Sequence, residues 1–315
     1  MTREKFQSFW NRFGTLCVLI FLFIGFTIGS PKYFPKPSNL IQCILQSAVY
    51  ILLAFGEFFT ILIAGIDLSV GSVACFAGII VAELSLKGVS PVICIIVGLI
   101  GAALCGFING VLIHALDLHP FVVTLGTNTI FRGICLVITG GNPVFNLPKW
   151  VKSLSSYIAV IPKPVIYVII VGLLLMFFTT QTVAGRNLYA LGGNKQSAWY
   201  SGINIKNYTI FAHTLSGILA GLAGIVMLAR VGAAEPTAGD GYETYAIAAC
   251  IIGGASLFGG KGRIWGVVLG GIIIGTINNG LNIMNVSSFW QKIVMGALII
   301  ASVALERLVS NKTKK

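Results

Sequence analysis

The sequence predicts an all-α protein that crosses a membrane many times, and three observations carry this prediction. The chain of 315 residues has a mean hydropathy of +0.93 and 10% charged residues, whereas soluble domains carry about 25%. Apolar runs recur along the whole chain, many of them near the roughly 20 residues that span a bilayer as a helix. A backbone in hydrocarbon must satisfy its own hydrogen bonds, and the alternating segments of a membrane β-barrel are not seen in the sequence.

About ten helical spans are expected, and turn-forming residues separate them. Proline, glycine and lysine occur in the connections at 31–37, 87–91 and 259–263. The expected spans are 13–30, 40–64, 70–87, 91–113, 119–139, 164–181, 208–229, 244–258, 264–284 and 288–306. We expect residues 1–315 to form a single transmembrane domain whose first span is not cleaved, because no A-x-A site follows it.

Lysine and arginine predict the orientation of these spans. The formal net charge is +12, which in a soluble protein would suggest a nucleic-acid partner. Here positive cytoplasmic loops explain it, so no nucleic acid is expected and both termini are placed in the cytoplasm. The expected cytoplasmic charges are Arg3, Lys5, Arg12, Arg186, Lys195, Lys206, Lys261, Arg263, Arg307, Lys312, Lys314 and Lys315.

A short repeat suggests that the chain has two related halves. The pattern G-x-I-N occurs at 106–109 and at 275–278, on the fourth expected span of each half. Because five spans per half is an odd number, the halves would be inverted in the membrane, which is a common plan of transporters. A chance match is the alternative. Glycines four residues apart, at 106 and 110, 266 and 270, and 271 and 275, would let these helices pack closely.

Polar side chains inside apolar spans are candidates for function, because a charge at the bilayer centre costs about 2.5–3.5 kcal/mol. Glu57 and Arg132 lie deep in two spans, where they either function or only hold the fold, by pairing across the bundle or by reaching a lipid headgroup. Asp67 and Ser69 either cap the third span or lie in a broken helix beside a cavity. Asparagine amides suit the hydroxyls of a sugar or hold helices together. These asparagines are Asn109, Asn278, Asn279 and Asn282.

The largest expected cytoplasmic connection, 182–207, is too polar to enter lipid, and its residue pattern is not that of a flexible linker. We expect Gly192 and Gly193 to break the chain and Asn194 to cap a short helix that ends before Gly202. The aromatic pair Trp199 and Tyr200 would lie on this helix, either docked against a partner protein or at the membrane surface.

This connection resembles a known family. GRNLYALGGN at 185–194 followed by SGIN at 201–204 is similar to the cytoplasmic loop of the permease subunits of bacterial ABC sugar importers. The family includes the ribose, xylose, arabinose, galactose and allose permeases, with the ribose and allose permeases nearest. Four further stretches match in order: GIDLSVGS at 65–72, EPTAGDGYE at 235–243, GGASLFGGKGR at 253–263 and NNGLNIMNVSS at 278–288.

The resemblance implies a monosaccharide permease of a bacterial inner membrane, with two inverted five-span halves like those of the vitamin B12-type importer. It implies a dimer that encloses the pathway, a separate ATPase subunit that grips the 182–207 connection, and a sugar-loaded binding protein outside. Implied coupling residues are Leu191, Gly193, Asn194, Lys195, Trp199, Tyr200, Gly202 and Ile203. The binding protein would meet Glu235, Asp240 and Glu243.

The chain itself carries no ATPase motif, so ATP and magnesium are expected on the partner subunit. The stretch GGKGR at 259–263 lacks the hydroxyl residue that follows lysine in a phosphate loop. No HExxH or GxSxG motif indicates an enzyme. All seven cysteines lie in apolar runs without a CxxC pair, so we expect buried thiols rather than metal ligands. A proton-coupled secondary transporter that uses Glu57 and Arg132 is the alternative, ahead of an intramembrane enzyme.

Overall fold

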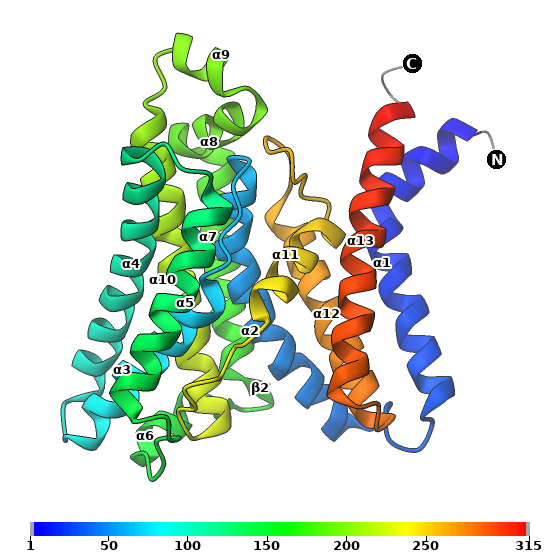
Figure 1. Ribbon diagram of the computed structural model, residues 1–315. Coiled ribbons are helices and arrows are strands. Elements are labelled where there is room, and N and C mark those ends of the chain that lie inside the picture. The colour runs from blue at the N-terminus through cyan, green and yellow to red at the C-terminus, as the bar shows by residue number, and fades with distance from the viewer. Residues whose placement is uncertain (1–2, 313–315) are drawn as a thin grey trace.

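The computed structural model describes residues 3–312, with side chains placed over 14–304. The side chains of seven expected cytoplasmic charges lie outside these described residues, namely Arg3, Lys5, Arg12, Arg307, Lys312, Lys314 and Lys315. The described chain is mostly helical (Figure 1). Its elements are α1 (Arg3–Gly29), α2 (Pro37–Leu62), α3 (Val70–Leu86), α4 (Pro91–Ala115), α5 (Pro120–Thr139), α6 (Lys149–Ser153), β1 (Tyr157–Ile158), β2 (Ile161–Pro162), α7 (Lys163–Gln181), α8 (Val183–Gly193), α9 (Lys195–Tyr200), α10 (Ile205–Val231), α11 (Tyr242–Ile252), α12 (Ile264–Ile283) and α13 (Ser288–Lys312).

Local sequence explains where several of these helices begin and end. A proline stands in the first turn of α2, α4, α5 and α7, where the missing N–H would have no helical partner and the ring already has a helical φ. Helices α5 and α10 end at Gly140 and Gly232, both in the left-handed conformation that glycine adopts without a Cβ clash.

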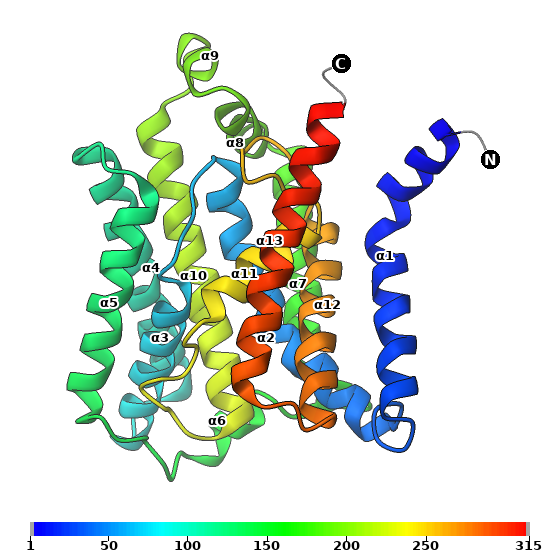
Figure 2. The same ribbon diagram turned by 45° about the vertical axis from the view of Figure 1, so that its right-hand side comes forward.

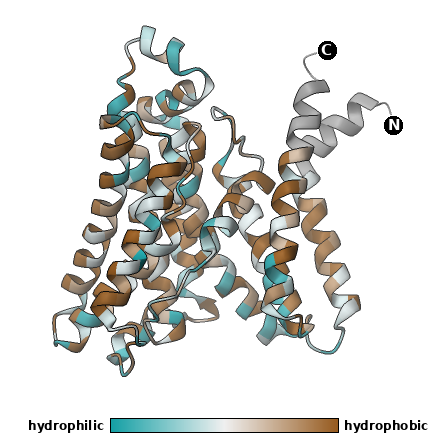
Figure 3. Cartoon of the chain, in the orientation of Figure 1, coloured by the Kyte–Doolittle hydropathy of each residue, from teal (hydrophilic) through white to brown (hydrophobic). Residues whose placement is uncertain are grey.

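The helices are those of a membrane protein. Six helices of the described chain are long and apolar enough to cross a bilayer, namely α2, α4, α5, α7, α10 and α12. Four shorter apolar helices accompany them, over 14–29, 70–86, 242–252 and 288–304. Hydrophobic residues dominate the flanks of α4 and α5, while hydrophilic residues gather at the two ends of the bundle, including α9 (Figure 3). The prediction of an all-α, multi-pass membrane protein is therefore confirmed.

The expected span 244–258 is wrong in length. Helix α11 ends at Ile252 and contains 11 residues, which cover about 16 Å at 1.5 Å per residue, or roughly half of a hydrocarbon core. The chain leaves the helix at Gly253 and Gly254, and Gly254 has a φ of +88°. Gly253 also lies so close to the backbone of Gly266 that no Cβ would fit between them. Residues 253–263 therefore form a loop.

Glycines bring the central helices into backbone contact. Helix α2 is the most enclosed of the long apolar helices, and α10 crosses both α2 and α4. A Cβ at Gly106 of α4 would overlap the carbonyl of His213 in α10, and one at Gly110 would lie 2.6 Å from the Cα of Ile210. Glycines 270 and 275 of α12 likewise face Ala249 of α11 and Ser47 of α2. The close packing predicted from the glycine spacing is confirmed.

The two halves of the described chain repeat one packing pattern. Helix α4 packs on α3 and α10, and α12 packs on α11 and α2. Likewise α3 contacts α10 and α5, while α11 contacts α2 and α13. Within each matched pair the helices run in opposite directions: α2 rises where α10 descends, and α4 rises where α12 descends (Figures 1 and 2). The segment between α2 and α3 and the end of α8 lie near one end of this bundle.

Candidate functional site

The chain between α2 and α3 is an irregular segment that begins beside the end of α8 and becomes buried at Asp67 and Ser69. We call residues 62–69 the strap. Helix α2 ends because Ala64 adopts a left-handed conformation with a φ of +61°. The N–H of Gly65 then donates to the carbonyl of Thr60 across 2.8 Å, and the N–H of Ala64 donates to that of Ile61 across 2.9 Å. These two bonds satisfy the last carbonyls of the helix in a Schellman arrangement, and they turn the chain back into the bundle.

Asp67 and Ser69 of the strap lie in a buried polar cluster. The cluster consists of Glu57, Asp67, Ser69, Asn109, His213 and Ser216, each at most 1% exposed. Asp67 Oδ1 accepts from the N–H of Ser69 at 3.0 Å and from its hydroxyl at 2.6 Å, while Oδ2 accepts from Ser216 at 2.9 Å. Asn109 donates its amide to Ser69 Oγ at 2.8 Å, and Glu57 Oε1 accepts the N–H of Asp67 at 3.1 Å.

The cluster joins the strap to three helices. Glu57 comes from α2, Asn109 from α4, and His213 and Ser216 from α10. A carboxylate that accepts three hydrogen bonds is stabilised in its buried position. The expectation that Asp67 or Ser69 caps α3 is wrong: Ser69 stands at the N-cap position but its side chain makes no capping bond. Its hydroxyl instead bonds to Asp67 and Asn109, because these buried groups have no water to bond.

Three atoms of this cluster lack hydrogen-bond partners. They are Glu57 Oε2, Asn109 Oδ1 and His213 Nε2, and within residues 14–304 no other buried side-chain nitrogen or oxygen is unpaired. The other ring nitrogen of His213 lies 3.0 Å from the carbonyl of Thr209, so it carries the proton and Nε2 is left without one in the neutral ring. Sequence reasoning identified neither Ser216 nor His213 as a site residue. The signal that could have found them is their spacing of three, which places both on one face of α10.

Arg132 and Glu57 do not pair, so the expectation of an ion pair across the bundle is wrong. Arg132 of α5 donates to the carbonyls of Pro236 and Ala238, at 2.9 and 2.7 Å. It thereby holds the loop between α10 and α11 against α5. A guanidinium can satisfy carbonyls in this way because it offers several donors in a fixed fork.

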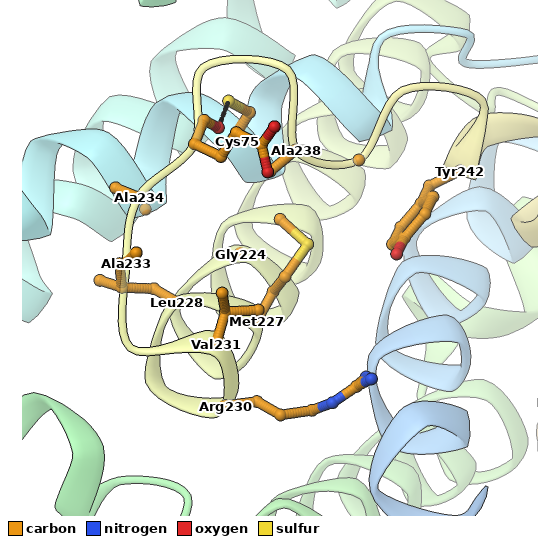
Figure 4. A pocket seen from close by; sticks show the side chains of 13 residues that line it. Cys75, Gly224, Met227, Leu228, Arg230, Val231, Ala233, Ala234, Ala238 and Tyr242 are labelled. Carbon is orange, nitrogen blue, oxygen red and sulfur yellow. Dashed lines mark hydrogen bonds between the residues drawn. The ribbon is translucent and has the colours of Figure 1, made fainter. Parts of the chain in front are cut away.

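The loop held by Arg132 carries the residues expected to meet a binding protein. Glu235 and Asp240 are exposed, and Glu243 at the start of α11 is half-buried. Asp240 lies 4.0 Å from Lys292 of α13 in an exposed ion pair. A cavity of about 150 Å³ lies beneath the loop, between Met227 of α10 and Tyr242 of α11 (Figure 4).

The asparagines of α12 have three separate environments. Asn278 donates to the carbonyl of Ile274, Asn279 exchanges hydrogen bonds with Asn39, and Asn282 accepts from Gln291. Near them Thr276 contacts Cys43 at the start of α2. Glu57 follows Cys43 by 14 residues on the same helix, which is about 20 Å. The structure therefore brings Asp67, Ser69 and Asn109 together and leaves the α12 asparagines in another region.

The 182–207 connection folds into two helices at one end of the bundle (Figures 1 and 2). Asn194 caps α9 as predicted, because its Oδ1 accepts from the N–H of Ser197 at 2.8 Å, and Gly202 follows the helix with a φ of +82°. The predicted break comes at the end of the glycine pair, because α8 ends at Gly193 and Asn194 is extended. Gly192 also serves packing, because a Cβ there would overlap the carbonyl of Leu62.

Helix α9 presents its aromatic residues to the outside. Trp199 is 61% and Tyr200 71% exposed, with their ring centroids 5.1 Å apart. Of the eight residues implied in coupling, Leu191 is buried and Ile203 half-buried. The exposed ones are Gly193, Asn194, Lys195, Trp199, Tyr200 and Gly202.

Apolar helices, a broken backbone that carries buried polar groups and an exposed aromatic helix at one end define an α-helical multi-pass membrane protein of the transporter type. The family described as branched-chain amino acid transport system / permease component matches residues 39–303. The chain belongs to this family.

Curated relatives cover nearly the whole chain. The D-allose transport system permease protein AlsC of Escherichia coli K12 is 53% identical over 309 residues, which are 97% of this chain and 94% of the relative. The ribose import permease protein RbsC of Bacillus subtilis 168 is 41% identical over 97% of this chain and 95% of its own. The autoinducer 2 import system permease protein LsrC of Photorhabdus luminescens is 33% identical over 94% and 92%. No solved structure matches the chain. The resemblance to permease subunits of bacterial ABC sugar importers is confirmed.

Proposed function

We propose that this chain is the membrane-spanning permease subunit of an ABC importer for a monosaccharide of the allose or ribose kind. Relatives named for D-allose and ribose transport support this substrate class. The sugar would reach the permease from a binding protein outside and leave it in the cytoplasm. The observation that carries the proposal is α9, a capped helix outside the apolar bundle with two exposed aromatic side chains.

A separate ATPase subunit supplies the energy in this proposal, and it binds both ATP and magnesium. Its contact is α9 and the end of α8, including Gly193, Asn194, Lys195, Trp199 and Tyr200. A helix of six residues is marginal on its own in water, and exposed Trp and Tyr are typical of interface anchors. Both chain ends lie in the cytoplasm in this arrangement, on the same side as α9, and the loop that carries Glu235, Asp240 and Glu243 meets the binding protein.

The permease acts as a dimer, and the ten spans of each subunit form two inverted halves, with α11 as a span that crosses only part of the bilayer. This organisation is like that of the vitamin B12-type importer. The repeated packing of the two halves supports the inversion. Half-buried Arg132 and Glu243 support the dimer, because charges at a helix flank need cover from protein or water rather than lipid. Lipid surrounds the rest of the bundle.

Reconstitution tests the proposal. The chain alone in proteoliposomes should fail to concentrate D-allose or D-ribose. Adding the ATPase subunit with ATP inside and the sugar-loaded binding protein outside should produce uptake of one of these sugars. Accumulation by the chain alone, driven by a proton gradient, would instead establish the secondary transporter. The bonds of Arg132 to two backbone carbonyls disfavour that alternative, because they give this residue a structural role in holding the loop between α10 and α11.

A further inference from the structure

Three backbone segments meet where the strap begins. The N–H of Gly260 donates to the carbonyl of Leu62 across 2.9 Å. A Cβ at Gly192 of α8 would overlap that carbonyl and lie 2.5 Å from the nitrogen of Gly260. A Cβ added at the adjacent Gly193 would have nothing within 4 Å. Glycine is therefore required at residue 192 and not at residue 193. We call Gly192, Gly259 and Gly260 the glycine clasp.

The clasp holds α8 against the strap without intervening side chains. A Cβ at Gly259 would lie 2.7 Å from the carbonyl oxygen of Gly192 and 2.9 Å from the nitrogen of Ala64. The hydroxyl of Tyr189, also in α8, donates to the carbonyl of Gly262 across 2.9 Å. Direct backbone contact leaves no flexible group to absorb a shift. A displacement of α8 therefore displaces residues 62–64.

The far end of the strap is anchored just as firmly. Three residues after Ala64, Asp67 enters the buried polar cluster, where its carboxylate accepts from Ser69 and Ser216. Ser69 is bonded to Asn109 of α4. Ala64 itself holds a left-handed φ of +61°, which is strained for a residue with a Cβ. Such strain persists only where the surroundings enforce it.

The cluster at this anchored end is incompletely bonded. Glu57 Oε2, Asn109 Oδ1 and His213 Nε2 have no partners, and these residues come from α2, α4 and α10 respectively. The strap is bonded to two of them, Glu57 through Asp67 and Asn109 through Ser69. A buried polar network with unpaired atoms is stabilised by any rearrangement that gives these atoms hydrogen-bond partners. The cluster is therefore suited to change partners when the strap moves.

We propose that the strap is the link that transmits a displacement of α8 and α9 to α2, α4 and α10, with Gly192 and Ala64 as positioning residues. The proposal rests on the proposed function, because it takes the ATPase subunit as the source of the displacement. It adds the path by which that displacement reaches the centre of the bundle: from Gly192 to Leu62 through the clasp, along the strap to Asp67, and then to Ser216 and Asn109.

Two substitutions test the path. Gly192→Ala inserts a methyl group into the clasp, and Ala64→Gly relieves the strain and makes the strap more flexible without removing a hydrogen bond. The complex of tagged chain and ATPase subunit is purified in nanodiscs, and ATP hydrolysis is measured with and without binding protein loaded with D-allose or D-ribose. Gly25→Ala is the matched control, because Gly25 is a helical glycine with nothing within 4 Å of an added Cβ.

Both variants should retain the ATPase subunit and lose sugar-dependent stimulation of hydrolysis by about fivefold or more, the lower end of typical coupling between sites, while Gly25→Ala keeps it. Full stimulation in Ala64→Gly overturns the proposal, even if Gly192→Ala fails to fold. An unmodified chain that does not retain the ATPase subunit would contradict the proposed function instead, so the two failures are distinguishable.

Discussion

The side-chain amide of Asn109 donates a hydrogen bond to the hydroxyl of Ser69 across 2.8 Å, although the residues are 40 positions apart. Both side chains are fully buried. Ser69 in turn donates to Asp67, so one chain of hydrogen bonds runs from α4 through the strap to Ser216 of α10. Polar bonds of this kind specify one arrangement of helices where apolar contacts alone would allow several.

Removing the carboxylate of Asp67 should destabilise the protein. Asp67→Ala leaves the donors of Ser69 and Ser216 buried without partners, at a cost of about 1–3 kcal/mol for each. Thermal unfolding in detergent should show a clear fall in melting temperature. Asp240→Ala is the control, because the Asp240 side chain is 75% exposed and surface substitutions change stability by about 0.5 kcal/mol or less. Equal melting temperatures of the two variants would contradict the structure of the cluster.

A methyl group at Gly106 should also destabilise the bundle. Gly106→Ala would overlap the carbonyl of His213, and overpacking of this kind typically costs about 1–3 kcal/mol. Gly133→Ala provides the comparison, since Gly133 has nothing within 4 Å of an added Cβ. The melting temperature should fall in the first variant and not in the second. A fall of the same size in both would show that α4 and α10 are not in backbone contact.

Loss of the cap at Asn194 should weaken binding of the ATPase subunit. Asn194→Ala removes a capping bond worth about 1 kcal/mol from a helix of six residues. Asn204→Ala is a matched control, because Asn204 caps α10 through the same type of bond, to the N–H of Asn207. Helix α10 has 27 residues and is packed along its length, so it does not depend on its cap. Co-purification of the ATPase subunit should decrease in the first variant only.

Glu57→Gln should preserve ATP-driven uptake. The glutamine side chain keeps the oxygen that accepts from the N–H of Asp67, and it removes the group that a proton-coupled carrier would titrate. The rate of sugar uptake by the complete complex should therefore stay within about twofold of the rate of the unmodified protein. This is well below a tenfold change, which would correspond to about 1.4 kcal/mol of lost free energy. If the variant loses sugar uptake and added ATP does not restore it at any concentration, the result would favour the proton-coupled alternative.

Hydropathy predicted where the helices are, because the requirement for internally bonded backbone in lipid acts on every span. It could not predict where α11 stops, since residues after Ile252 remain apolar and only the glycines at 253 and 254 turn the chain. Gly192 and Gly193 did predict where α8 ends. The sequence could not show that Gly192 also packs against Leu62 and Gly260, because these residues are far from it along the chain.

The candidate site was predictable in residue type but not in partners. Asp67, Ser69 and Asn109 stand out as polar residues in or beside apolar spans. Ser216 does not, because serine is common in membrane helices, and its partner Asp67 lies 149 positions away. Only the crossing of α10 over α2 and α4 makes them neighbours.

The contact between α2 and α10 has a consequence for how substitutions act. These two helices are counterparts in the repeated packing, and they touch each other where an added Cβ at Gly56 would lie 2.9 Å from the carbonyl oxygen of Ser216. A change at Gly56 or Ser216 therefore perturbs both halves at once. The contact of Gly106 with His213 of α10 and that of Gly275 with Ser47 of α2 also join the two halves, and they are counterparts of each other in the repeated packing. The chain thus carries its own matched pair of substitution sites for comparing the two sides of the bundle within a single molecule.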